Sequence, residues 1–191
     1  MKELLSGKID LVAIGCSAGG VDALIQLLKQ LSPKFSLPIV IILHMARDSK
    51  NLFSKTLGAQ SPIPLTEAQE KEKIENGHIY LAPPDYHLLV EKNHTFSLST
   101  EDPVNFSRPS IDVFFSSAAI VYRERLLGVV LTGANSDGAE GLKEIIVSGG
   151  FGVVENPESA KFREMPEAAI SIAKPQCILK LEDIIDLISD L

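Results

Sequence analysis

Short apolar runs alternate with longer amphipathic segments in the first part of the chain. Residues 9–14 form one apolar run, and residues 37–43 form a second that is rich in β-branched side chains, as buried parallel strands are. Between them, apolar residues recur at helical spacing over residues 21–31, and this stretch ends at Ser32-Pro33. The alternation predicts βα units.

The middle of the chain has a different pattern. Residues 78–82, 86–91 and 95–99 are short strand candidates, and the last two predict an antiparallel hairpin. A helix is predicted after Arg108-Pro109-Ser110. Its apolar face is expected to contain Val113, Phe114, Ala118 and Val121.

The last third returns to the βα pattern. Strands are predicted at residues 126–131, 152–154 and 177–179. Residues 132–138 form a polar, glycine-rich loop, and helices are expected from Ala139 to Gly149, after Met165-Pro166, and over residues 181–191. With no repeat or linker, residues 1–191 are predicted to form a single α/β domain.

Composition and charge limit which binding partners and which cellular compartment are expected. A net charge of -7 with no long basic run argues against nucleic acid as a partner. The two cysteines, Cys16 and Cys177, show no C-x-x-C spacing, which fits neither a disulfide framework nor a zinc site. The first apolar run is interrupted by Asp10 and is too short for a signal peptide or a membrane span, so we expect a cytoplasmic protein without direct membrane insertion.

The first loop has the pattern of a nucleophile elbow. Residues 15–20 (GCSAGG) match G-x-S-x-G, which exposes the serine, here Ser17, at a strand-to-helix turn and leaves the Ala18 amide as an oxyanion donor. Cys16 precedes the apex, so we expect its side chain in the core. A dinucleotide-binding loop is one alternative, although Ser17 replaces its central glycine and His44 stands where its acid is expected. A helix-capping serine is the other.

Two further polar residues follow buried strands. His44 closes the second strand and is a candidate general base for Ser17. Asp137 precedes a predicted helix; it either caps that helix or accepts the Nδ1–H of His44 and stabilises the imidazolium. Because all three loops follow parallel strands, Ser17, His44 and Asp137 are expected at one edge of the sheet.

Taken together, the loops resemble the catalytic domain of the chemotaxis protein-glutamate methylesterases, over nearly the whole chain. The resemblance is carried by residues 14–20 (IGCSAGG), His44-Met45, residues 80–88 (YLAPPDYHL), residues 108–114 (RPSIDVF), residues 131–133 and 137–139 (LTG and DGA), and residues 165–169 (MPEAA). Their order and spacing make the resemblance specific.

The resemblance implies Ser17, His44 and Asp137 as the catalytic triad of a serine hydrolase, on a three-layer, doubly wound, mostly parallel sheet of the flavodoxin or Rossmann type with an antiparallel hairpin. It implies hydrolysis of glutamate γ-methyl esters on the cytoplasmic helices of chemoreceptors, with release of methanol, and deamidation of receptor glutamines as a second activity. This chemistry requires no metal or organic cofactor. Many members carry an N-terminal receiver domain, whereas this sequence starts at the catalytic domain. We therefore expect either regulation by a separate receiver protein or a domain that is fused elsewhere or excised from a longer chain.

Three positions depart from the resemblance. Ala18 stands where many members have threonine, Ala134 where methionine is common, and Glu155 where glutamine is frequent. Ala18 and Ala134 would form the oxyanion site and its wall, so their small side chains favour the alternative of a catalytically silent module that binds a receptor or signalling partner.

Overall fold

A parallel sheet of seven strands forms the centre of the protein. The structure is a computed structural model that describes residues 5, 7–45 and 52–191. The strand order is β3-β4-β2-β1-β7-β8-β9, with neighbours parallel throughout. The strands are β1 (Leu11–Cys16), β2 (Ile39–Leu43), β3 (Leu65–Glu67), β4 (Ile79–Leu81), β7 (Leu126–Val130), β8 (Phe151–Glu155) and β9 (Cys177–Leu179).

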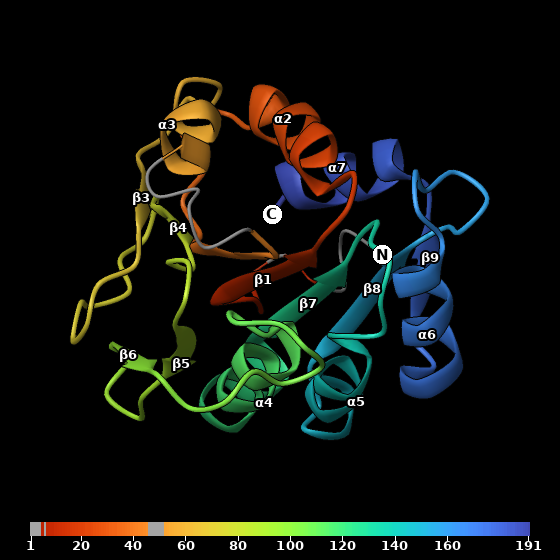
Figure 1. The fold of residues 1–191 in the computed structure, drawn as a ribbon. Helices are drawn as coiled ribbons and strands as arrows, with labels where there is room; N and C mark the ends of the chain where they lie inside the picture. Colours follow the sequence, from red (N-terminus) through yellow and green to blue (C-terminus); the bar gives the residue numbers. More distant parts are fainter. Residues whose placement is uncertain (1–4, 6, 46–51) are drawn as a thin grey trace.

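Helices cover both faces of this sheet (Figure 1), so the fold has three layers. One face carries α2 (Gly20–Gln30), α3 (Leu52–Gly58) and α7 (Leu181–Ser189), and the other carries α4 (Ile111–Tyr122), α5 (Ala139–Val147) and α6 (Glu164–Ala173). Each side has its own apolar core, because side chains of the central strands alternate between the two faces. The fold predicted from the sequence is confirmed.

The antiparallel hairpin is a separate two-stranded sheet. It consists of β5 (His87–Val90) and β6 (Phe96–Ser99), and β5 packs against α4. The short helix η1 (Arg123–Arg125) then leads from α4 into β7. The hairpin was predicted at these positions, within a residue or two at each end.

Some local predictions were wrong or incomplete. Neither α3 nor β3 was predicted, because each is short and its apolar pattern is weak. The predicted buried face of α4 was partly wrong: Val113 and Val121 are half-buried, whereas Phe115, Ala119 and Tyr122 are buried with Phe114 and Ala118. None of the helices in the described ranges has the length and apolar character that a membrane span needs.

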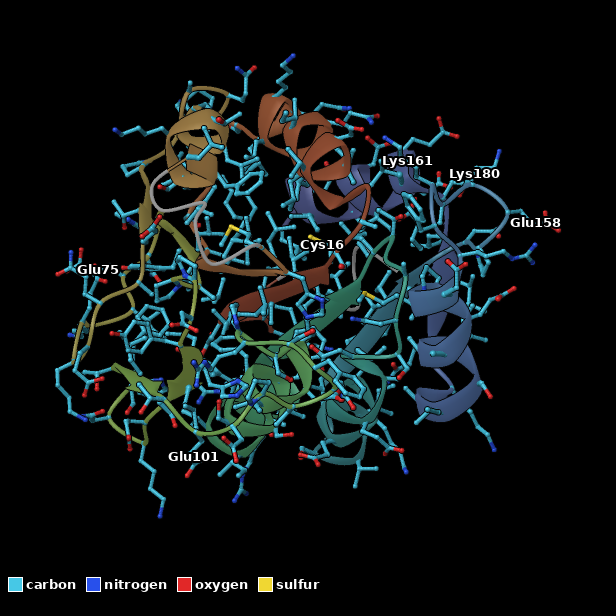
Figure 2. All side chains as sticks on the ribbon, viewed as in Figure 1. Cys16, Glu75, Glu101, Glu158, Lys161 and Lys180 are labelled. Atoms are coloured by element: carbon cyan, nitrogen blue, oxygen red, sulfur yellow. The ribbon has the colours of Figure 1, made fainter. Side chains whose placement is uncertain are left out.

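The order of the strands reverses at β1, which lies between β2 and β7. Such a switch point opens a crevice at the carboxyl ends of the strands. The register aligns Cys16 with Leu43, so Ser17 and His44 are the next residues on neighbouring strands. Cys16 itself is buried beneath α2 (Figure 2), as predicted, and burial, with a contribution from the charge of Glu155, raises the pKa of its thiol.

Candidate functional site

Ser17 lies on a tight turn between β1 and α2. Gly19 has a φ of 80°, in the left-handed region that glycine adopts without strain, and the turn closes when the Gly20 amide donates to the Ser17 carbonyl at 2.8 Å. The Ser17 amide donates to the Thr132 carbonyl at 3.0 Å. Within the described part of the chain, the next amide, that of Ala18, has no hydrogen-bond acceptor, so it is free to bind an anion.

Thr132 connects this turn to the loop after β7. Its hydroxyl donates to the Ala18 carbonyl at 2.9 Å and accepts from the Phe162 amide at 2.8 Å. The Thr132 amide donates to the carboxylate of Glu155 at 2.8 Å. Burial raises the pKa of Glu155, although the hydrogen bond from Thr132 opposes the shift. Together with the hydrogen bond from the Ser17 amide to the Thr132 carbonyl, these contacts fix Thr132 against the Ser17 turn.

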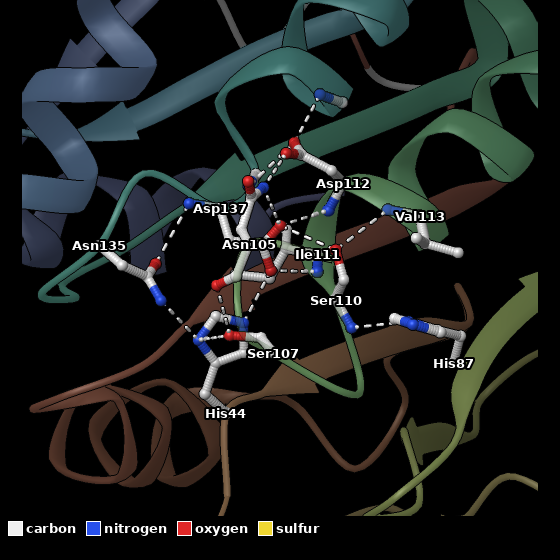
Figure 3. Close-up of polar contacts among 12 residues, drawn as sticks. His44, His87, Asn105, Ser107, Ser110, Ile111, Asp112, Val113, Asn135 and Asp137 are labelled. Atoms are coloured by element: carbon white, nitrogen blue, oxygen red, sulfur yellow. Dashed lines mark hydrogen bonds and ion pairs between the residues drawn. The ribbon is translucent and has the colours of Figure 1, made fainter. Parts of the chain in front are cut away.

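His44 and Asp137, 93 residues apart, meet at the same edge of the sheet. The His44 amide donates to the Cys16 carbonyl at 3.2 Å, which places the main chain of His44 beside the residue that precedes Ser17. Its Nε2 lies 2.8 Å from Asp137 Oδ2 (Figure 3). The prediction that His44 Nδ1 contacts Asp137 was wrong: the ring is oriented with its Nε2 edge toward the carboxylate.

The carboxylate of Asp137 is buried and saturated with hydrogen bonds. The donors are His44 Nε2 at 2.8 Å, Ser110 Oγ at 2.8 Å, the Ile111 amide at 2.6 Å, the Asp112 amide at 3.2 Å and Asn105 Nδ2 at 3.2 Å. Burial alone would raise the pKa of Asp137, but the hydrogen bond from His44 and those from Ile111 and Ser110 lower it. Asp137 is therefore held as an anion at the N-terminus of α4.

The capping interpretation of Asp137 was wrong for the helix it precedes. The cap of α5 is Gly138, which makes no side-chain hydrogen bond. Instead, Asp112 Oδ1, from the first turn of α4, accepts from the amides of Gly138 and Gly141 at 2.9 and 2.7 Å. Burial and then the nearby charge of Asp137 raise the pKa of Asp112 to about 6, against the effect of these two amides. The two carboxylates thus have opposite shifts.

The second nitrogen of His44 faces two polar side chains. Asn135 Nδ2 lies 3.3 Å and Ser107 Oγ 3.4 Å from His44 Nδ1. Asn135 Oδ1 accepts from the Asp137 amide at 3.1 Å, so its NH₂ group is the part that points to the imidazole. An amide donor on Nδ1 and a carboxylate on Nε2 favour the neutral tautomer with the proton on Nε2. Nδ1 is then the basic nitrogen.

Not all predicted residues are in contact. The structure records no hydrogen bond between Ser17 Oγ and His44, both of which lie in the described ranges. Ala18 is half-buried and Ala134 is exposed. A hollow of about 360 Å³ opens beside the imidazole, and it is lined by His44, Met45, Pro103, Phe106, Ser107, Arg108 and Pro109.

Several polar residues of the site were not predicted. Ser110 was recognised only as the start of a helix, although it both caps α4 and donates to Asp137. His87 is buried, and its Nδ1 accepts from the Ser110 amide at 3.2 Å. Asn105, Ser107 and Asn135 lie in loops, where the sequence alone gives no signal for a tertiary contact. Among the described residues, no group of His, Cys, Asp and Glu is arranged to hold a metal ion.

Comparison with known proteins gives a consistent result. The family model described as CheB methylesterase matches residues 12–188. The crystal structure of the Thermotoga maritima CheB methylesterase catalytic domain superimposes with a TM-score of 0.90 at 29% identity, covering 96% of this chain and 99% of that one.

Two curated relatives illustrate different lengths. A protein of Trichodesmium erythraeum named protein-glutamate methylesterase/protein-glutamine glutaminase is 37% identical over 94% of this chain, which spans about half of that protein (52%). A protein of Leptospira interrogans carries the same name provisionally; it is 48% identical over 92% of this chain and 91% of its own length. These findings support the methylesterase hypothesis and not the silent module.

Proposed function

The chain belongs to the CheB methylesterase family, and from this premise we propose that it is a serine hydrolase that demethylates protein glutamate γ-methyl esters. Ser17 is the nucleophile, His44 the general base and Asp137 the residue that orients the imidazole. Ala18 and Ala134 supply the oxyanion site and its wall. One observation carries the proposal: His44 Nε2 lies 2.8 Å from Asp137 Oδ2, and His44 and Ser17 are the first residues after the paired strands β2 and β1.

In the acylation step, His44 Nδ1 takes the proton from Ser17 Oγ as the oxygen attacks the ester carbonyl. The resulting oxyanion accepts hydrogen bonds from backbone amides, with the Ala18 amide, which has no acceptor among the described residues, as the first donor. The positive charge that forms on the imidazole is balanced by Asp137, whose lowered pKa keeps it ionised. When the tetrahedral intermediate collapses, Nδ1 returns the proton to the departing methoxide, and methanol leaves.

In the deacylation step, water attacks the glutamyl ester of Ser17 and gives its proton to His44 Nδ1. Collapse of the second intermediate releases the glutamate side chain and returns the proton to Ser17. The same residues deamidate a glutamine when the leaving group is ammonia instead of methanol. The proposed second activity therefore needs no further residue.

The proposed substrate is the methylated cytoplasmic helix of a chemoreceptor, and the proposed compartment is the cytoplasm. The relatives are named for glutamate methyl ester and glutamine hydrolysis, which supports a protein side chain as the substrate. The approach to His44 is a surface hollow rather than an enclosed pocket, so a side chain that projects from a helix can enter it. Regulation by a separate receiver protein stays a prediction.

Ser107 is the rival nucleophile, because its hydroxyl lies 3.4 Å from His44 Nδ1. Two features favour Ser17: it lies two residues before Gly19, the N-cap of α2, and the amide of its neighbour Ala18 has no hydrogen-bond acceptor among the described residues. The Ser107 hydroxyl also lies 3.4 Å from the Asn105 carbonyl, within its own turn.

The test is methanol release from a methylated receptor fragment by the wild type, Ser17→Ala and Ser107→Ala. We expect Ser17→Ala to lower turnover by at least about 1,000-fold, since residual activity then rests on the oxyanion site alone. We expect Ser107→Ala to retain most of the wild-type turnover. Normal turnover by Ser17→Ala would remove Ser17 from the mechanism.

A further inference from the structure

Phe106 is the most exposed large apolar side chain of the described residues, and it borders the hollow beside His44. It is 104% exposed relative to an extended reference, whereas the other exposed large apolar side chains among the described residues are 38–81% exposed and do not line the hollow. A phenyl ring in water forgoes the free energy that burial gives. Isolated exposed apolar residues are common, so the position of Phe106 needs a second observation.

The backbone conformation at Phe106 provides this second observation. Val104 and Ser107 exchange two backbone hydrogen bonds, at 3.2 and 2.9 Å, and so close a two-residue turn. Both central residues have positive φ, 50° at Asn105 and 61° at Phe106. Such a turn favours asparagine first and glycine second. A bulky residue with positive φ is unfavourable, so neither burial nor turn geometry explains Phe106.

The turn is also attached to the proposed catalytic residues on both sides of Phe106. Asn105 Nδ2 donates to Asp137 Oδ1 at 3.2 Å and to Asp112 Oδ2 at 2.8 Å. Ser107 Oγ contacts His44 Nδ1 at 3.4 Å. The backbone of Phe106 is therefore held at a fixed place relative to His44, at the border of the hollow.

The chemistry of the hollow indicates its occupant. Among the described residues, the one Lys or Arg that lines it is Arg108, whose guanidinium is already bound by Asp85 at 2.7 Å and by the carbonyls of Thr100 and Glu101. The rest of the described lining is mixed: Met45, Pro103, Phe106 and Pro109 are apolar, and His44 and Ser107 are polar but uncharged or only weakly basic. A neutral methyl ester fits this lining better than a free carboxylate does, because the charge of Arg108 is already paired with Asp85.

We propose that Phe106 is a specificity-determining residue: it packs against an apolar side chain of the receptor helix next to the esterified glutamate. This inference rests on the proposed function. Phe106 adds contact area to the macromolecular substrate that a small reagent does not reach, as aromatic residues do at protein interfaces.

The test compares Phe106→Gly with the wild type on two substrates, a methylated receptor fragment and a small fluorophosphonate probe. Glycine suits the second turn position, so the variant keeps or increases its thermal stability. We expect kcat/KM for receptor demethylation to fall about tenfold more than the rate of probe labelling, mainly through KM. Phe106→Leu restores most of the difference, and Val147→Ala, at a residue that is 81% exposed on α5, changes neither rate.

Equal losses on both substrates would mean that Phe106 only shapes the turn, and unchanged receptor turnover would mean that it makes no contact with substrate. Either result would overturn the inference. Failure of the proposed function itself is distinguishable, because the wild type would then neither demethylate the receptor nor react with the probe at Ser17.

Discussion

The proposed triad is more completely hydrogen-bonded on the Asp137 and His44 side than on the Ser17 side. On one side, the buried carboxylate of Asp137 accepts hydrogen bonds from five groups and already holds His44 at 2.8 Å. On the other side, the backbone of Ser17 is fixed by Thr132, but the structure records no hydrogen bond for the Ser17 hydroxyl within the described residues. The base is therefore preorganised, whereas the nucleophile is positioned only through its main chain.

This difference has a physical consequence. A fully hydrogen-bonded buried carboxylate contributes to stability as well as to chemistry, because its removal leaves buried donors without partners. A hydroxyl without a hydrogen bond contributes almost only to chemistry. Contacts to the nucleophile often tighten when substrate binds, so the missing contact is expected to form in the complex.

The largest expected effect comes from removing the side chains of Asp137 and Ser17 one at a time. Asp137→Ala and Ser17→Ala should both lower receptor demethylation by at least about 1,000-fold. Their free energies of unfolding should differ: Asp137→Ala loses about 2–4 kcal/mol because it leaves buried amides unpaired, and Ser17→Ala changes by less than about 0.5 kcal/mol. Urea denaturation measures both; equal destabilisation would contradict the contrast between the two sides.

Asp112, whose carboxylate lies near that of Asp137, is expected to change the stability with pH in the opposite direction to Asp137. Because the folded-state pKa of Asp112 is about 6, above its ordinary value of 3.8, the native state binds its proton more tightly than the unfolded state does. Its contribution to stability is therefore greatest below pH 4 and is lost as pH rises to about 6. Asp137 has the opposite sign, since its lowered pKa gives stability that is lost on acidification below its ordinary value.

In Asp112→Asn, the fall in unfolding free energy between pH 4 and pH 7 should therefore be smaller than in the wild type. The difference should be at most about 3 kcal/mol, from a shift of roughly two pKa units. Denaturant titrations at pH 4, 5, 6 and 7 measure it. Parallel curves for the two proteins would show that Asp112 does not titrate in this range.

A smaller loss of turnover is expected from a substitution of Asn135, whose side chain contacts His44 Nδ1, the nitrogen that does not face Asp137. Asn135→Asp keeps the oxygen that accepts from the Asp137 amide but puts a carboxylate beside His44 Nδ1. The imidazole then lies between two carboxylates and keeps its proton, so receptor turnover should fall about 10- to 30-fold. ¹⁵N chemical shifts of His44 should change from the neutral Nε2–H tautomer to the imidazolium.

Ser136→Asp is the matched control, because it adds the same charge at the exposed neighbouring residue. Its turnover should stay within about twofold of the wild type, as expected for a screened surface charge. A similar loss in both variants would point to the added charge rather than to the contact with Nδ1.

The smallest expected effect concerns the backbone support of the nucleophile. Thr132→Val removes the hydroxyl that contacts the Ala18 carbonyl and the Phe162 amide. We expect a loss of about 1 kcal/mol in unfolding free energy and a several-fold slower probe reaction, both largely restored in Thr132→Ser. Unchanged probe reactivity would show that the Ser17 turn does not depend on Thr132.

Most of the fold could be predicted from the sequence because its strands are short, apolar and separated by clear turn residues. The pattern over residues 9–14 and 37–43 led directly to β1 and β2, and the hairpin of β5 and β6 was equally clear. The helix α3 and the strand β3 were not predicted. They have seven and three residues, and at that length tertiary contacts rather than periodicity decide the conformation.

The site was predictable in its location but not in its orientation. Three polar residues after parallel strands indicated one sheet edge, and the structure places Ser17, His44 and Asp137 there. Which imidazole nitrogen faces Asp137 depends on the side-chain torsions of His44 in the folded site, and no sequence pattern encodes them. The same holds for Asn105 and Asn135, whose contacts arise only when separate loops meet.

The most direct test of the central claim is to find which residue of the full chain a fluorophosphonate probe modifies, by peptide mass spectrometry. The account predicts a single adduct on Ser17 that disappears in Ser17→Ala and is strongly slowed in Asp137→Ala. An adduct on Ser107, or no adduct on a folded protein that still demethylates the receptor, would contradict it.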